Sequence, residues 1–118
     1  MSIQRFLDAQ DEISLSGASY YNDAWSELRE GEKKTHWMWF MFPQLKGLGQ
    51  SEKSLHYGIF DGFEAMMYMK NPVLRSRYAN LVGIVLQHVA SGRTLEDIFG
   101  SVDAQKFRSS LSLFSKYL

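Results

Sequence analysis

The histidines are the first residues to test for chemistry, because imidazole can transfer protons near neutral pH and bind metal ions. His36 directly precedes an aromatic run, Trp37–Phe42, whereas His56 and His88 lie on separate predicted helices. The three show none of the spacings typical of metal ligands. The chain has no cysteine, which excludes thiolate nucleophiles, disulfides and cysteine-bound metals. We therefore expect no metal site and no cofactor, and His36 is either an acid, base or ligand contact or a donor to a nearby carbonyl.

The aromatic run that follows His36 has two interpretations. Adjacent aromatic side chains bury a large apolar area, so the simplest one places them in the core. However, Trp37 and Trp39 flank Met38 and cannot all point inward equally, and each buried indole N–H needs a hydrogen-bond partner. The alternative is a stacking platform for a base or another planar ring.

A glycine-rich turn, Lys46–Ser51, precedes a predicted helix and could hold an anion on free backbone N–H groups. It carries a lysine and a hydroxyl, as a phosphate site would. The glycine spacing and the Lys-Ser/Thr ending of a P-loop are absent, and no strand precedes the turn. A plain turn explains the same residues.

A polar cluster lies near the C-terminal end of the sequence. Asp103, Lys106, Ser109 and Ser110 fall within about two helical turns, which places Lys106 and Ser110 on one face. A serine nucleophile with a lysine base is one hypothesis, but the order and spacing match no Ser-Lys enzyme motif. Capping and a solvated ion pair are the structural alternative. Arg77 adds positive charge on another predicted helix.

Composition limits the classes of protein that need to be considered. The chain has 118 residues, 45% of them hydrophobic and 22% charged, which fits one packed domain spanning residues 1–118. Thirteen basic residues balance thirteen acidic ones, so no net field would gather nucleic acid. There is no leader pattern and no apolar run long enough to span a membrane. We expect a cytoplasmic protein that binds neither a nucleic acid polymer nor a membrane.

The elements that position these residues are all expected to be helices, apart from Trp37–Phe42, whose conformation the pattern leaves open. Apolar residues recur at helical spacing, and no segment shows the alternation typical of strands. Capping residues mark most boundaries, including a capping box at Asp61 and Glu64. The sequence thus predicts an all-α domain of about six or seven helices. They occupy Ile3–Ile13 behind Ser2 as N-cap, a segment from Tyr20 ended by Gly31, a short helix after Ser51, a helix opened by the Asp61 and Glu64 capping box that closes before the Asn71-Pro72 pair, a long helix from Pro72 to Gly92, one turn from Thr94 to Gly100, and a last helix from Ser101 whose apolar stripe reaches Leu118.

Residues throughout the chain resemble a known family. The most specific of them are in the segment His36–Gln44, followed by Gly47, Gly49, Ser51 and Tyr57. This combination resembles the family catalogued as domain of unknown function 1810, and the resemblance implies a mainly helical fold without indicating a function. It continues through Arg5-Phe6, Ala9-Gln10, Glu64-Ala65, Asn71-Pro72-Val73-Leu74, Arg77, Ile98-Phe99-Gly100-Ser101, Asp103, Lys106, Ser109-Ser110 and Leu113-Phe114.

Two features differ from the pattern of that family. Residues 14–19 look slightly expanded, and the sequence stops after Leu118, where the family usually continues into another helical segment. Such a truncation would open a groove, be replaced by a partner subunit, or expose apolar surface that favours a homo-oligomer.

We hypothesise that the chain is a non-catalytic protein that binds, and sequesters, a nucleotide-like anion. Two alternatives stay open. One is an enzyme acting on a nucleotide or an ADP-ribose-like substrate, with His36 as acid or base and Asp103 or Glu64 as its carboxylate partner. The other is a protein-interaction or assembly module. The predicted ligand-binding residues are His36, Trp37, Trp39, Gln44, Gly49, Ser51, Tyr57, Arg77, Lys106 and Ser110, and we assign no catalytic residue.

Overall fold

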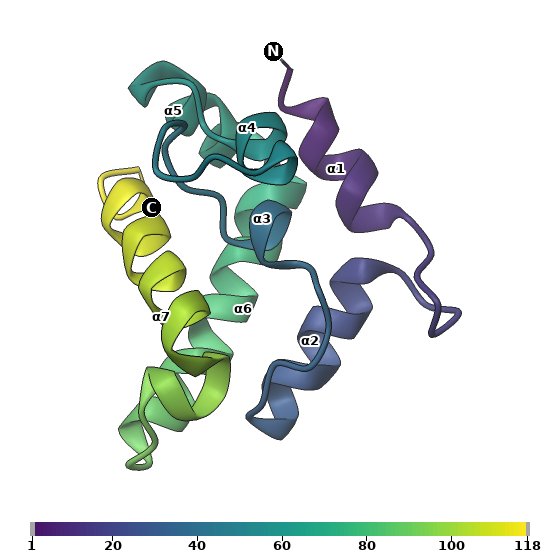
Figure 1. Ribbon diagram of the computed structural model, residues 1–118, viewed down its shortest axis with the longest axis vertical. Coiled ribbons are helices and arrows are strands. Elements are labelled where there is room, and N and C mark those ends of the chain that lie inside the picture. Colours follow the sequence, from purple (N-terminus) through teal and green to yellow (C-terminus); the bar gives the residue numbers. More distant parts are fainter. Residues whose placement is uncertain (1, 118) are drawn as a thin grey trace.

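The structure is a computed structural model that describes residues 2–117. Within this range the chain forms seven helices and no strand, so the predicted all-α class is confirmed (Figure 1). The helices are α1 (Gln4–Asp11), α2 (Tyr20–Glu30), α3 (Met38–Met41), α4 (Glu52–Tyr57), α5 (Gly62–Lys70), α6 (Pro72–Ala90) and α7 (Leu95–Phe114).

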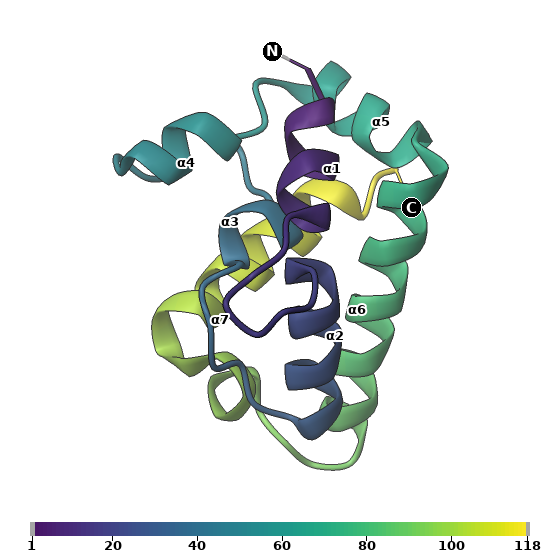
Figure 2. The same ribbon diagram turned by 90° about the vertical axis from the view of Figure 1, so that its right-hand side faces the viewer.

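The long helix α6 is the element around which the others pack. Figure 1 shows α2 running beside it on one side and α7 on the other, and Figure 2 shows α5 at its N-terminal end. The helices α1 and α3 close the remaining side, where α3 contacts both α1 and α4. The face of α6 that meets these neighbours is buried and apolar, with Leu74, Leu81 and Val85 fully excluded from solvent. The core therefore lies between α6 and the shorter helices.

Side-chain caps begin most of the helices, as the sequence predicts. The Asn71 side chain accepts hydrogen bonds from two backbone N–H groups at the start of α6, and Pro72 occupies the first helical position. Thr94 and Asp97 form both halves of a capping box. Gly100 has a φ of 79°, in the left-handed region, and separates the first turn of α7 from the longer helix that follows. Leu118, which we expected to extend the apolar stripe of that helix, lies outside the described residues.

Three details of the predicted helix boundaries are wrong. The first helix ends at Asp11 rather than Ile13, because Glu12 is extended and Ile13 pairs with Ser19 in an isolated antiparallel bridge. Its N-cap is Ile3, whereas Ser2 was expected to cap it. The expected capping box of α5 is only half formed: Asp61 accepts from the backbone N–H of Glu64, but the Glu64 carboxylate accepts from Arg5 and from the N–H of Phe60.

The middle of the aromatic run forms the single helical turn α3, flanked by Trp37 and Phe42, which answers the question of conformation that the sequence pattern leaves open. Most of its side chains are buried in the core, and Trp37 has no exposed surface. The exception is Trp39, which is only half-buried. Successive side chains of a helix point in directions about 100° apart, which explains why neighbours in this run differ in burial. The core interpretation therefore holds for every residue of the run except Trp39.

Arg5 joins α1 to the end of α4, to the segment that follows it and to α5. Its two terminal nitrogens donate to the two carboxylate oxygens of Glu64 at 2.9 and 3.0 Å, and this pair is largely buried. The remaining guanidinium N–H groups donate to the backbone carbonyls of Ser2, His56 and Gly58. All five donors of Arg5 thus have acceptors, which only the planar fork of arginine can arrange.

Candidate functional site

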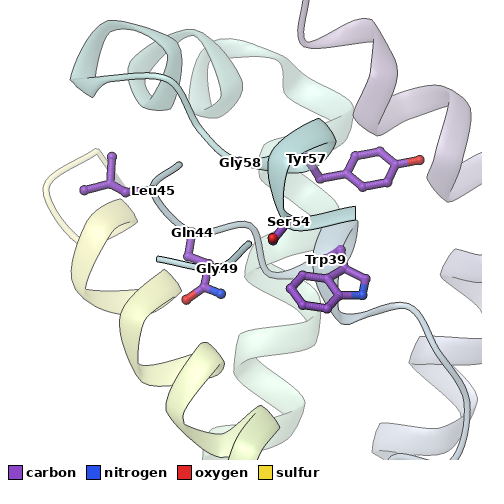
Figure 3. A pocket seen from close by; sticks show the side chains of 7 residues that line it. All are labelled: Trp39, Gln44, Leu45, Gly49, Ser54, Tyr57 and Gly58. Carbon is purple, nitrogen blue, oxygen red and sulfur yellow. The ribbon is translucent and has the colours of Figure 1, made fainter. Parts of the chain in front are cut away.

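The residues around α3 form the wall of the candidate site. Figure 3 shows Trp39 from α3, Ser54 from α4, and Gln44 and Gly49 from the connecting segment gathered around one small cavity. The ring of Tyr57 points away from Gln44 and packs against Phe6 of α1 at a centroid distance of 6.0 Å. The cavity has a volume of about 10 Å³, which is room for one water molecule at most. No planar ring can enter it.

A larger hollow lies next to this cavity, on the side of α7. The two share Gln44, and the larger one has a volume of about 550 Å³, which is in the range of small-molecule sites. Of the residues between 2 and 117 that line it, Lys106 alone is charged, and the other polar groups are neutral amides and hydroxyls. We call it the α7 hollow, and its lining residues are Gln44, Leu48, Ser101, Val102, Gln105, Lys106 and Ser109.

Lys106 links the α7 hollow to the tryptophan. Its ammonium nitrogen lies 3.6 Å from the centroid of the Trp39 ring, which is a close cation–π contact. The same nitrogen lies 3.5 Å from one carboxylate oxygen of Asp103, and Lys33 pairs with the other oxygen at 2.9 Å. Two cations and one anion leave one positive charge in this group. Because Lys106 contacts both Trp39 and Asp103, its position is fixed before an anion enters the hollow.

Glu27 organises the loop that carries Lys33 and Trp37. Its carboxylate accepts hydrogen bonds from the backbone N–H groups of Lys34 and Thr35, from the Thr35 hydroxyl and from the Trp37 indole N–H. Partial burial raises the pKa of Glu27, but these four donors outweigh it and hold the pKa below its ordinary value. The backbone N–H of Lys33 also donates to the carbonyl of Ile98 at 2.8 Å. The loop is thus fixed at both α2 and α7.

Five of the ten residues predicted to bind a ligand are brought together here. Trp39, Gln44, Gly49 and Tyr57 line the small cavity, and Lys106 lines the α7 hollow together with Gln44. Tyr57 lies at the edge of this group, between Phe6 and Phe40. Burial, followed by the negative charge of Glu12, raises the pKa of its hydroxyl.

The other five lie elsewhere or face away. Trp37 is fully buried and offers no ring face to solvent, and Ser110 is buried in the core with its hydroxyl 3.0 Å from that of Tyr78. Arg77 pairs with Asp11 at 2.7 Å and donates to the buried Gln10, so it joins α6 to α1. His36 is exposed and lines neither the small cavity nor the α7 hollow.

The fifth of these residues, Ser51, belongs to the glycine-rich turn. Its side chain accepts a hydrogen bond from the backbone N–H of Ser54 and so caps α4. This helix has only six residues. Gly49 packs so closely that an added Cβ would lie 2.9 Å from the Ser54 side chain. The turn is therefore a compact capped connection beside the site.

Sequence reasoning missed two residues that shape this site. Glu27 in α2 and Lys33 in the linker after it are ordinary charged residues, and no motif marks them. Their partners show the reason: Lys33 contacts Asp103, which lies 70 positions later in the chain. Of the ion pairs in this group, the sequence predicted only the one between Lys106 and Asp103, which are three residues apart on the same helix.

Neither a metal cluster nor a membrane-spanning helix is found among the described residues. Among residues 2–117, no group of three or more histidine or acidic side chains is placed to hold a metal ion. None of the helices described is long and apolar enough to cross a membrane.

Comparison with known proteins places the chain in a family. It is similar to the conserved hypothetical protein Rv1873 from Mycobacterium tuberculosis, whose crystal structure matches with a TM-score of 0.87 and 40% sequence identity over 98% of this chain and 76% of that one. No curated protein matches it. Residues 1–117 match the family described as protein of unknown function DUF1810. The predicted resemblance is confirmed, and the chain belongs to the DUF1810 family.

Proposed function

We propose that this protein binds a small nucleotide-like anion in the α7 hollow without transforming it. The observation that carries the proposal is Lys106, a lysine held 3.6 Å above the Trp39 ring at the wall of a hollow of about 550 Å³. A fixed cation binds an anion without first losing the side-chain entropy of a free lysine. Trp39 is thus the support of the lysine rather than the surface on which a base stacks.

The rest of the hollow suits the uncharged part of such a ligand. Leu48 and Val102 line it with exposed apolar side chains, against which a planar ring could lie. Gln44, Gln105 and Ser109 supply amide and hydroxyl groups that can both donate and accept hydrogen bonds. A nucleotide has this combination of a planar ring with polar edges and an anionic end.

The alternative of an enzyme has less support. His36 is exposed and away from the hollow, and the Glu64 carboxylate is fully engaged by Arg5 and the N–H of Phe60. Asp103 is paired with two lysines. General acid–base catalysis needs a group within hydrogen-bond reach of the substrate. We therefore keep binding as the proposal. A cytoplasmic location stays a separate prediction, which the lack of cysteine supports.

Calorimetric titration with ADP, adenosine and inorganic pyrophosphate tests the proposal. We expect ADP to bind, and we expect Lys106→Met to weaken its binding about tenfold, since the substitution keeps the apolar stem and removes the charge. Arg75→Ala is the matched control, because Arg75 is exposed on α6 and does not line the hollow. Recovery of intact ADP after prolonged incubation is the expected result for binding without turnover.

Two results would count against the proposal. One is a wild-type protein that binds none of the three compounds at millimolar concentration. The other is ADP binding that Lys106→Met and Arg75→Ala leave equally unchanged, which would move the site elsewhere. Conversion of ADP to products by the wild-type protein would replace binding with catalysis as the function of the hollow.

A further inference from the structure

The outer face of α5 exposes large apolar side chains that the fold does not use. Phe60 just before the helix is 69% exposed, Phe63 54% and Met67 40%. Phe63 and Met67 are four residues apart and so lie on the same face of the helix, and Lys70 follows them one turn later on that face. Together with Ile3, the N-cap of α1, the three apolar residues line a groove of about 600 Å³. We call this surface the α5 face.

We propose that the α5 face binds a second copy of this chain, with the two α5 helices antiparallel across a two-fold axis. In an antiparallel pair, a step toward the N-terminus of one helix matches a step toward the C-terminus of the other. When Phe63 faces the second copy's Met67, Asp61 therefore comes level with position 69 and lies beside the second copy's Lys70. A two-fold axis repeats both contacts.

Charge complementarity is the argument for a second copy as the occupant. Asp61 and Lys70 are both exposed, and they stand at opposite ends of α5. One antiparallel register therefore matches the apolar residues and the opposite charges together, whereas a parallel pair would bring like charges together. Antiparallel helices also oppose their dipoles. The chain has no net charge at pH 7, so no general repulsion resists the approach of two copies.

This surface is separate from the proposed ligand site. The α5 face is lined by residues just before α1, by α5 and the segment before it, and by Lys46, and among residues 2–117 it shares no lining residue with the α7 hollow. Figure 1 shows α5 and the middle of α7 in different parts of the molecule. Pairing would leave the hollow open, so the two proposals can fail independently.

Sedimentation equilibrium over a concentration series tests the pairing. We expect the wild-type protein to form dimers as its concentration rises, and we expect Phe63→Glu to weaken dimerisation at least about tenfold, since it buries a charge at the centre of the interface. Leu86→Glu is the matched control, because Leu86 is also about half exposed, at 49%, and lies on α6. Unchanged far-ultraviolet circular dichroism would show that both variants stay folded.

A zero-length carboxyl-to-amine cross-linker tests the register. In a mixture of ¹⁵N-labelled and unlabelled protein, we expect cross-linked peptides that join Lys70 to Asp61 of the other isotope. A protein that stays monomeric at millimolar concentration would overturn the proposal. So would a dimer that Phe63→Glu leaves intact, or one whose cross-links join residues outside the α5 face.

Discussion

The loop before α3 gives the sharpest test of how the fold positions the candidate site. Glu27 holds this loop through four hydrogen bonds to one carboxylate. Replacing Glu27 with glutamine keeps the shape of the side chain but removes its charge, and it turns one acceptor oxygen into an NH₂ group that faces other donors. We therefore expect Glu27→Gln to loosen the loop that carries Lys33 and Trp37.

The expected magnitude follows from the donors. A hydrogen bond to a charged group contributes about 1.5–3 kcal/mol, whereas the amide oxygen of glutamine can still accept one or two weaker ones. Glu27 is half-buried, so solvent compensates part of the loss. We expect the free energy of unfolding at pH 7 to fall by about 2 kcal/mol. With a urea m-value of about 1.5–2 kcal/mol/M, the midpoint would move down by roughly 1 M.

The dependence on pH separates this effect from a general loss of packing. Because the four donors hold the pKa of Glu27 below its ordinary value of about 4.5, the carboxylate stabilises the fold fully above that pH. This contribution is lost as the pH falls through the lowered pKa and the wild-type side chain takes up a proton. Urea unfolding between pH 7 and pH 3.5 should therefore show the difference between wild type and Glu27→Gln shrinking below about pH 4.5.

Glu30→Gln is the matched control on the same helix. Glu30 is exposed, and its contact with Lys34 is a surface ion pair at 3.7 Å, so we expect a change within about 0.5 kcal/mol. The reasoning would be refuted if Glu27→Gln were no less stable than Glu30→Gln at pH 7. A loss that stayed constant down to pH 3.5 would equally refute the role assigned to the carboxylate.

Other predictions concern steric fit and the Arg5 fork. An added Cβ at Gly58 would lie 2.8 Å from the Lys46 Cα and from a backbone oxygen, so Gly58→Ala should lower the free energy of unfolding by about 2 kcal/mol or more. Gly83→Ala meets no atom within 4 Å in the middle of α6 and should raise it by about 0.5–1 kcal/mol. Arg5→Lys should cost about 2–3 kcal/mol, since lysine cannot supply five donors, while Arg75→Lys should cost almost nothing. Urea unfolding at pH 7 measures all four, and equal effects within either pair would contradict the packing described.

Most of the fold was predictable because nearby residues in the sequence determine where most of its helices begin and end. Asn71-Pro72 and Thr94 with Asp97 cap their helices as expected, and Gly100 breaks α7 where its lack of a side chain permits a positive φ. The end of α1 was not predictable, since Ile13 continues the apolar pattern but pairs with Ser19 instead. Glu64 likewise has the spacing of a capping box, yet the distant Arg5 takes its carboxylate. Long-range partners override local patterns in both places.

The candidate site was predictable only in part, for the same reason. Sequence identified Trp39, Gln44 and Lys106, but it could not show that the lysine lies across the indole ring. It grouped Ser110 with Lys106 on one helix face. In the structure Ser110 is buried in the core beside Tyr78, whereas Lys106 lines the hollow. It also placed Trp37 and Trp39 in one candidate platform, although one turn of helix buries the first and leaves the second half-exposed.

The indole ¹⁵N–¹H signals of the three tryptophans give the most direct test of ligand binding at the α7 hollow. Trp39 lies under Lys106, while Trp37 is buried and Trp25 packs with Arg29 on α2. During titration with ADP, an anion that binds the Lys106 ammonium where it lies over the ring should shift the Trp39 signal in a saturable way and leave the other two unchanged. Three unchanged signals at millimolar ADP, or a shift confined to Trp25, would contradict the account.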